Sequence, residues 1–330
     1  MEWSVLHRRS WFNIGLFLLG IWLFPCISLI SQEDITVPEL YDHIERLTDP
    51  KLKGRPPGGK LNKKLIRYIR RDLKKAGVES FKGGYFQPFK AQIRVEQGQS
   101  PGPEIKTWNV VGYIPGSHPQ LSQEFIVLGA HYDHLGMGGP SSRSETQTGL
   151  HYGADDNASG TSALLEIAEK LAANRSKLDR SIILVAFGAE EQGLLGSRYF
   201  IQNPPVPKTH IKMMVNMDMV GRLNDEKHIY MGGAGTFPGG MDLMKQKGLA
   251  LGLNPIVHAG EVGGSDHVSF YREKISVLGV HTGGHPQYHT PDDTIDLINF
   301  PGQQKVARYI YEVLVHLASK DQQLHFIDQG

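Results

Sequence analysis

From Thr107 onward, short apolar runs alternate with segments whose apolar residues recur at helical spacing. The apolar runs predict β-strands, because they have the length and β-branched content of buried strands. The predicted strands are 108–114, 125–129, 181–187, 212–217 and 275–280, and the predicted helices are 159–173, 239–248, 267–271 and 302–318. Such alternation is typical of a sheet with helices on both faces. We therefore expect an α/β fold, a three-layer αβα sandwich around a mixed, mostly parallel sheet.

Two further helices are predicted before Thr107, at 38–47 and 61–76. In the second, Leu65, Ile69 and Leu73 recur every four residues, and Gly77 ends the pattern. The Lys and Arg residues between them are interpreted as a solvated face, although they could also contact an anionic surface. The stretch 232–240 lacks the spacing of a nucleotide-binding loop and is expected to be a turn. We predict a single domain over residues 32–330, with its core at about 107–320.

The first 31 residues have the pattern of a targeting segment. Arg8 and Arg9 precede an almost wholly apolar run over residues 11–30. This order matches the charged and apolar regions of a secretory signal peptide, with a possible cleavage site after Ser28. The run is also about long enough to cross a bilayer, so an uncleaved membrane anchor is the alternative. Both interpretations predict a protein that works outside the cytoplasm, either secreted or periplasmic, or attached to a membrane.

Charge and cysteine content exclude several classes of function. Lys and Arg number 35 against 34 Asp and Glu, so the net charge is +1. A chain this close to neutral is a poor candidate for nucleic-acid binding, which depends on neutralising phosphates. Cys26 is the single cysteine, which excludes an internal disulfide and a cysteine-based metal cluster. Any bound metal must therefore be held by His, Asp and Glu.

Polar residues gather directly after the predicted strands, where ligands bind in open α/β sheets. Five segments carry them: 129–134 (GAHYDH), 153–160 (GADDNASG), 187–193 (FGAEEQG), 216–221 (NMDMVG) and 286–293 (PQYHTPDD), the last with GGSDH at 263–267 upstream. Each segment alone has an ordinary explanation, such as a loop histidine, a helix cap or glutamates opening a helix.

The segments together point to a metal site. Glu190 and Glu191 after a buried strand would repel each other and lose solvation, and a nearby dication relieves both effects. A carboxylate held in the glycine turn around Asp156 can bridge two metal ions. The five segments supply two histidines and three carboxylates as ligands, and one further glutamate. This is the nitrogen and oxygen ligand set of a two-zinc hydrolytic site.

These five segments, in this order, resemble the two-zinc aminopeptidases of metallopeptidase family twenty-eight. The resemblance covers about residues 38–320 and includes the Gly54-Arg55 loop and the strand at 109–112. It implies the zinc-dependent exopeptidase fold and two zinc ions per chain. Some members carry a protease-associated domain before the His-x-Asp motif. Only a short segment, about 81–106, stands there in this chain, so no such domain is expected.

The resemblance also implies a role for each site residue. His131 and Asp218 would bind one zinc, Glu191 and His289 the other, and Asp156 would bridge them. Glu190 would be the general base that takes a proton from the attacking water, and Asp133 would orient His131. Tyr288 would donate a hydrogen bond to the oxyanion, because the other tyrosine position of the family is occupied here by 262–264 (VGG). His134, His281 and His285 are expected either to support the ligands or to be solvated, and Asp266 is given no ligand role.

The implied function is a zinc-dependent aminopeptidase acting on peptides with a free N-terminus. Two alternatives on the same fold are a carboxypeptidase and a glutaminyl cyclase with a single zinc. The complete ligand set argues against the single-zinc enzyme. A third alternative is an inactive binding domain on the peptidase scaffold, which is disfavoured because all five ligands and Glu190 are present. Side-chain preference and oligomeric state cannot be deduced from the sequence.

Overall fold

Eight strands form one mixed sheet in the computed structural model, which describes residues 1, 34–95, 100–260 and 263–329. The strands are β1 (Phe86–Gln92), β2 (Glu104–Ile114), β3 (Phe125–His131), β4 (Ser181–Phe187), β5 (Ile211–Met217), β6 (His228–Gly232), β7 (Asn254–Val257) and β8 (Ser276–His281). Their spatial order is β1-β2-β4-β3-β5-β8-β6-β7. The central strands β4, β3, β5 and β8 are all parallel to their neighbours in this group, so their carboxyl ends lie at one edge.

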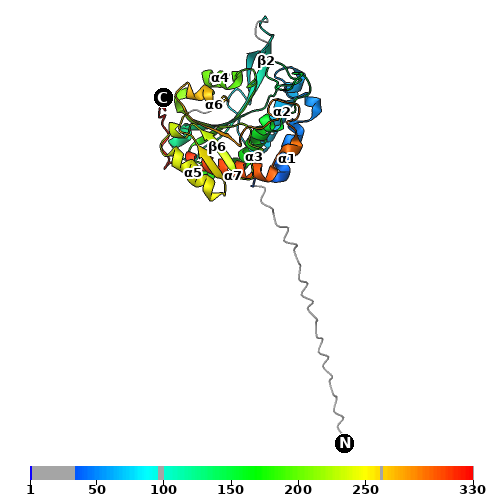
Figure 1. Cartoon of the computed structure of the whole chain (residues 1–330). Coiled ribbons are helices and arrows are strands. Elements are labelled where there is room, and N and C mark those ends of the chain that lie inside the picture. Colours follow the sequence, from blue (N-terminus) through cyan, green and yellow to red (C-terminus); the bar gives the residue numbers. More distant parts are fainter. Residues whose placement is uncertain (2–33, 96–99, 261–262, 330) are drawn as a thin grey trace. The chain divides into compact units, whose positions relative to one another are not determined.

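Helices cover both faces of this sheet (Figure 1). The helices are α1 (Val37–Leu47), α2 (Gly59–Lys75), α3 (Gly160–Ala173), α4 (Leu195–Gln202), α5 (Gly240–Ala250), α6 (His267–Tyr271) and α7 (Phe300–Ala318). Alternate residues of the central strands enter two separate cores. Leu128, Leu184 and Val215 pack with α1, α2, α3 and α7, whereas Val127 and Val185 pack with α4 and α6. The predicted three-layer αβα sandwich is therefore confirmed.

The predicted strands and helices all occur, with bounds that shift by a few residues. Four elements were not predicted: β1, β6, β7 and α4. The first and last strands of the sheet each contain a proline, Pro88 and Pro255, which edge strands tolerate because one side of an edge lacks a ladder partner. Their sequences therefore lack the apolar run that identifies a central strand. The stretch 232–240 is a turn region that includes a short 3₁₀ helix, Ala234–Thr236, as expected.

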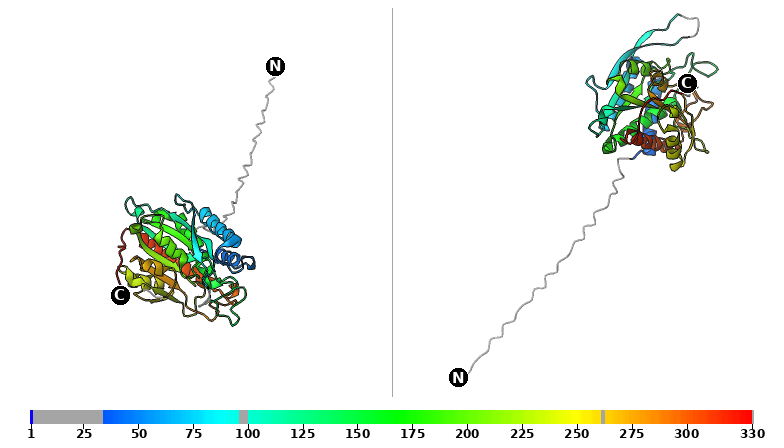
Figure 2. Two further views of the ribbon diagram at one scale, coloured as in Figure 1. Left: turned by 90° about the horizontal axis from the view of Figure 1, so that it is seen from above. Right: turned by 90° about the vertical axis from the view of Figure 1, so that its left-hand side faces the viewer.

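The β1–β2 hairpin extends beyond the body of the sheet and stands above the helices in two views (Figures 1 and 2). The short segment at about 81–106 before the His-x-Asp motif thus forms most of a long antiparallel hairpin.

The predicted signal peptide or anchor at residues 11–30, with Cys26, lies outside the described residues. Within the described part of the chain, no helix combines the length and hydrophobicity required to span a bilayer. The targeting segment and the single domain over 32–330 stay predictions.

A buried arginine fixes the loops that surround the carboxyl edge of the sheet. The guanidinium of Arg55 donates hydrogen bonds to four backbone carbonyls, those of Leu47, Tyr132, Tyr152 and Gly153, at 2.6–3.0 Å. Burial lowers the pKa of Arg55 to about 10, while nearby carboxylates oppose the shift, so the side chain is charged at neutral pH. Gly54 beside it has φ +66°, and a Cβ there would lie 2.4 Å from the His151 carbonyl oxygen.

We expect Arg55→Lys to destabilise the protein by roughly 2–5 kcal/mol, measured by urea unfolding. An ammonium keeps the charge but cannot reach all four carbonyls, and each buried acceptor left without a donor costs about 1–3 kcal/mol. Arg67→Lys on the exposed face of α2 is the matched control and should change the free energy of unfolding by less than about 0.5 kcal/mol. Equal stability of the two variants would contradict this role of Arg55.

Candidate metal centre

The predicted site residues meet at the carboxyl edge of the four parallel strands. His131 is the last residue of β3, and Asp218 follows β5 directly. Glu190 and Glu191 lie in the loop after β4, and Tyr288 and His289 lie in the loop after β8. Asp156 lies in the irregular turn Ala154–Ser159 that leads into α3. Because neighbouring parallel strands end at the same edge, residues as far apart in the sequence as Asp156 and His289 come within contact distance.

One part of the site joins His131, Glu190 and Asp218, whose potential ligand atoms all lie within 4.8 Å of one another. His131 Nε2 lies 3.4 Å from Asp218 Oδ1 and 3.3 Å from Asp156 Oδ1. The other Asp156 oxygen, Oδ2, lies 3.1 Å from His289 Nε2, which is also 3.2 Å from Glu191 Oε2. Asp156 therefore stands between two groups of potential ligands, as a bridging carboxylate would.

The chemistry of these groups fits a metal ion. Asp156 Oδ2 and Asp218 Oδ1 are buried and make no hydrogen bond, although a histidine nitrogen lies within 3.4 Å of each. A buried carboxylate oxygen without a donor is costly, and a cation held between it and the histidine removes that cost. Imidazole nitrogen with carboxylate oxygen is a ligand set that suits zinc.

His134 is a site residue for which the sequence left two interpretations open. It is fully buried, its Nδ1 lies 2.8 Å from Glu191 Oε1, and it forms a compact group with Asp156 and Glu191. It was expected either to support the ligands or to be solvated, and its burial excludes the second. Its place three residues after His131 in the same loop could have suggested it, but histidines in such loops are commonly solvated.

Asp133 contacts the site through two groups. The backbone carbonyl of Asp133 lies 3.2 Å from His131 Nδ1, whereas its carboxylate Oδ1 is 3.9 Å from that nitrogen. The same Oδ1 accepts a hydrogen bond from the backbone N–H of Glu190 at 3.0 Å. Asp133 therefore contacts His131 through its backbone carbonyl, while its carboxylate fixes the backbone of Glu190. That Asp133 orients His131 stays a prediction.

A second supporting carboxylate, Asp293, was not assigned a role from the sequence. Asp293 is buried and accepts hydrogen bonds from the backbone N–H groups of Asp155 and Asp156 at 3.0–3.1 Å. It thereby holds the turn that presents the Asp156 carboxylate. His285 lies 3.3 Å from Asp155 Oδ2, and His281 stacks on Tyr230, so neither lies among the potential ligand groups.

Burial and neighbouring charges raise the pKa values of both Glu190 and His289. Desolvation, with the neighbouring Glu191, Asp266 and Asp218 carboxylates, raises the pKa of Glu190 well above its usual range. Desolvation would lower the pKa of His289, but its Asp156 and Glu191 partners outweigh it and raise that pKa to about 10. The protein alone thus retains protons in the site, and metal ions would replace them.

Tyr288 lies against the site from the side of His289. The two rings stack with their centroids 3.8 Å apart, and the Arg143 guanidinium covers the Tyr288 ring at 4.5 Å. Burial and the nearby carboxylates raise the pKa of the Tyr288 phenol, so the hydroxyl is a proton donor at neutral pH. His289 itself is oriented by the Ser141 carbonyl, 2.8 Å from its Nδ1.

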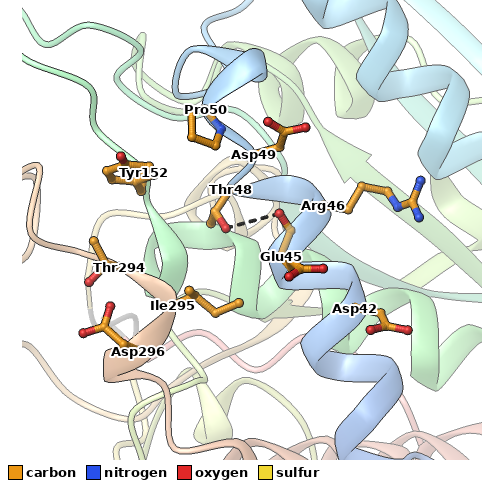
Figure 3. Close-up of a pocket in the computed structure, with 10 residues that line it drawn as sticks. All are labelled: Asp42, Glu45, Arg46, Thr48, Asp49, Pro50, Tyr152, Thr294, Ile295 and Asp296. Carbon is orange, nitrogen blue, oxygen red and sulfur yellow. Dashed lines mark hydrogen bonds between the residues drawn. The ribbon is translucent and has the colours of Figure 1, made fainter.

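A separate cavity of about 790 Å³ lies between α1 and the loop around Thr294, with Tyr152 at one wall (Figure 3). Figure 3 shows the carboxylates of Asp42, Asp49 and Asp296 around it and no histidine among its lining residues. It is larger than the cavity that contains the Asp156, Glu190 and Asp218 side chains. Because none of the potential ligand groups lines it, it is not the candidate site.

Comparison with known proteins agrees with this geometry. Residues 109–314 match Peptidase family M28. A probable leucine aminopeptidase of Arthroderma otae is 26% identical over 265 residues, covering 77% of this chain and 64% of that protein. Aminopeptidase YwaD of Bacillus subtilis is 29% identical over 218 residues, covering 62% and 42%. The chain thus spans less than two thirds of the length of these curated relatives.

Solved structures of similar fold include a zinc aminopeptidase from Bacillus subtilis, with a TM-score of 0.67 and 17% identity, covering 88% of this chain and 97% of that chain. A glutaminyl cyclase from Bacteroides thetaiotaomicron has a TM-score of 0.66 and 21% identity, covering 86% and 98%. At these identities the similarity shows the fold alone. The same fold occurs in an aminopeptidase and in a glutaminyl cyclase, so it does not distinguish the two activities.

We expect His289→Ala to weaken zinc binding by at least about tenfold, because it removes an imidazole within 3.2 Å of two carboxylates. Zinc per chain after dialysis against a chelator, measured by atomic emission, tests this. His285→Ala is the matched control, since His285 touches only Asp155 among the site carboxylates and should leave zinc content unchanged. Full zinc retention by the His289 variant would remove His289 from the ligand set.

Proposed function

The chain belongs to peptidase family M28, and we propose that it is a zinc-dependent aminopeptidase, which releases N-terminal residues from peptides. The observation that carries the proposal is the position of Asp156 between His131 and His289, with Glu190 beside the same cluster. The curated relatives described above are named as aminopeptidases. Their names and the donor set support the same activity.

In this proposal His131 and Asp218 would hold one zinc ion, Glu191 and His289 would hold a second, and Asp156 would be shared by the two. His134 supports the second group through its contact with Glu191. Bound zinc supplies Lewis-acid polarisation of the scissile carbonyl and makes water acidic enough to attack at neutral pH. The remaining steps depend on side chains of the protein.

Glu190 is the proposed general base. Its backbone N–H donates a hydrogen bond to Asp133, and its carboxylate lies with His131 and Asp218 in the cluster. It takes a proton from the attacking water and passes it to the leaving amine. The same burial that raises its pKa makes it a stronger base than a solvated glutamate, and bound cations would lower that pKa.

Tyr288 is the proposed hydrogen-bond donor to the oxyanion. Its ring is held between His289 and Arg143, which limits the motion of the hydroxyl. A donor fixed before the reaction costs no reorganisation when charge develops on the carbonyl oxygen. The free α-amine of the substrate would be bound by the site carboxylates, which explains why only the terminal residue is removed.

The substrates are proposed to be peptides outside the cytoplasm, on the strength of the apolar run at 11–30, which would secrete the domain or attach it to a membrane.

Glu190→Gln should keep its zinc and lose about 10²–10⁴-fold in kcat, because removal of a general base leaves the ligands in place. The measurement is hydrolysis of a Leu-initiated peptide with a free N-terminus by the zinc-loaded protein, with an N-acetylated copy and an N-terminal glutamine peptide in parallel. Glu226→Gln, at an exposed position, is the matched control.

Cleavage of the acetylated peptide from its C-terminus would replace the aminopeptidase by a carboxypeptidase. Cyclisation of the glutamine peptide without hydrolysis would indicate a glutaminyl cyclase. No turnover by the zinc-loaded protein would leave an inactive peptidase-like domain. Loss of zinc from Glu190→Gln would exchange the roles of Glu190 and Glu191.

Tyr288→Phe should lower kcat by about 10²-fold with little change in KM, because the lost hydrogen bond forms mainly in the transition state. Steady-state kinetics on the free-amine peptide tests this. The ring stacking on His289 is kept in the phenylalanine variant, so the zinc content should not change. A normal kcat would show that the Tyr288 hydroxyl does not contact the oxyanion.

A further inference from the structure

Two cavities of different character flank the ligand cluster. One, of about 190 Å³, is lined by Glu190, Asp218 and Tyr288 and ends against Asn216, Gly279 and Val280 of the sheet. The other, of about 410 Å³, has a mostly apolar wall formed by Pro56, Pro57, Ile93, Ile105, Leu135 and Met137. We call the second the hairpin cavity, because Ile93 and Ile105 belong to the chain segments of the β1–β2 hairpin.

The hairpin cavity lies beside the ligand cluster. His134, whose Nδ1 contacts Glu191, lines it. Ser141, whose carbonyl lies 2.8 Å from His289 Nδ1, lines it as well. Gln192 follows Glu191 and accepts a hydrogen bond from the backbone N–H of Arg94 at 2.8 Å, which ties the hairpin to the loop of the proposed base. The cavity is therefore one residue removed from Glu191 and His289, within reach of the part of a bound peptide that extends past the cluster.

The two cavities differ in size and lining. The smaller one is lined mainly by the polar side chains of the cluster, with exposed Gly263 and Gly264 at its rim, whereas exposed Arg94, Met137 and Pro140 line the rim of the hairpin cavity. Met137 keeps 57% of its surface exposed, and a large apolar side chain at the mouth of an apolar cavity is typical of a binding surface.

An aminopeptidase must hold one residue before the scissile bond and let the rest of the peptide leave. The smaller cavity is lined by the proposed base Glu190 and the proposed donor Tyr288, so it suits the N-terminal residue. The larger, apolar cavity on the other side of the cluster suits the residue after the bond. We propose that the hairpin cavity binds the side chain of the substrate's second residue and selects large apolar side chains there. This proposal rests on the proposed function and adds a preference on the leaving-group side.

The test compares two tripeptides, Leu-Phe-Ala and Leu-Gly-Ala, with the zinc-loaded full-length protein. Burying an aromatic side chain in this cavity should raise kcat/KM for Leu-Phe-Ala at least about tenfold over Leu-Gly-Ala. Ile105→Ala and Met137→Ala should each reduce that ratio about threefold or more. Leu249→Ala on α5, which removes a side chain that is 64% exposed, is the control and should leave the ratio unchanged.

Met137→Asp provides a second arm at an exposed position where folding is not at risk. It should raise kcat/KM for Leu-Lys-Ala relative to Leu-Phe-Ala, because a carboxylate at the rim attracts the ammonium. Cleavage of both neutral tripeptides at equal rates, or an unchanged ratio in both alanine variants, would overturn the subsite while leaving the proposed function intact. Hydrolysis of neither tripeptide would overturn the proposed function and the subsite with it.

Discussion

Buried negative charge is the constraint around which this end of the molecule is arranged. Asp133, Asp155, Asp156, Glu191, Asp266 and Asp293 are all buried at the carboxyl edge of the sheet, and Glu190 and Asp218 lie beside them. Carboxylates away from water are tolerated only with cations or hydrogen-bond donors close by. The structure provides backbone N–H groups for Asp133, Asp155 and Asp293, histidines for Asp156 and Glu191, and a buried guanidinium at Arg55. Metal ions would complete that balance at Asp156 Oδ2 and Asp218 Oδ1, which have no hydrogen-bond donor.

Supporting hydrogen bonds join the loops of the site to one another. Arg55 ties the end of α1 to the loops after β3 and before α3, while Asp293 ties the turn of Asp156 to the loop of His289. Each contact joins segments that are distant in sequence, so no single loop can move without breaking hydrogen bonds in another. Preorganisation of this kind is what a hydrolytic centre requires, because its charges must be in place before the transition state forms.

Two cavities lie at this centre. Residues of β5 and β8 line the smaller one, and the hairpin and the loop after β3 line the larger one. The hairpin is therefore more than an edge of the sheet, because Arg94 joins it to the loop of Glu190 and Glu191. Changes in the hairpin would alter which peptides reach the centre and leave the chemistry of the centre unchanged.

The sequence by itself determined the layer architecture and the ligand candidates. Apolar runs with turns between them identify central strands, because strands buried on both faces are apolar along their whole length. Polar residues after those strands identify the edge of the sheet where ligands bind. His131, Asp156, Glu190, Glu191, Asp218 and His289 were chosen on those grounds and from the family resemblance, and the structure brings them together. The edge strands β1 and β7 were not predicted, because prolines and polar residues interrupt their apolar patterns.

Only the tertiary structure could decide the contacts of His134, Asp293 and Arg55 and the shape of the hairpin cavity. His134 and Asp293 act through groups 57 and 137 or 138 residues away, and Arg55 through carbonyls up to 98 residues away. A backbone carbonyl carries no mark in the sequence, since every residue has one. Which acceptors are buried together depends on how the loops fold over the sheet, and local sequence patterns do not contain that information.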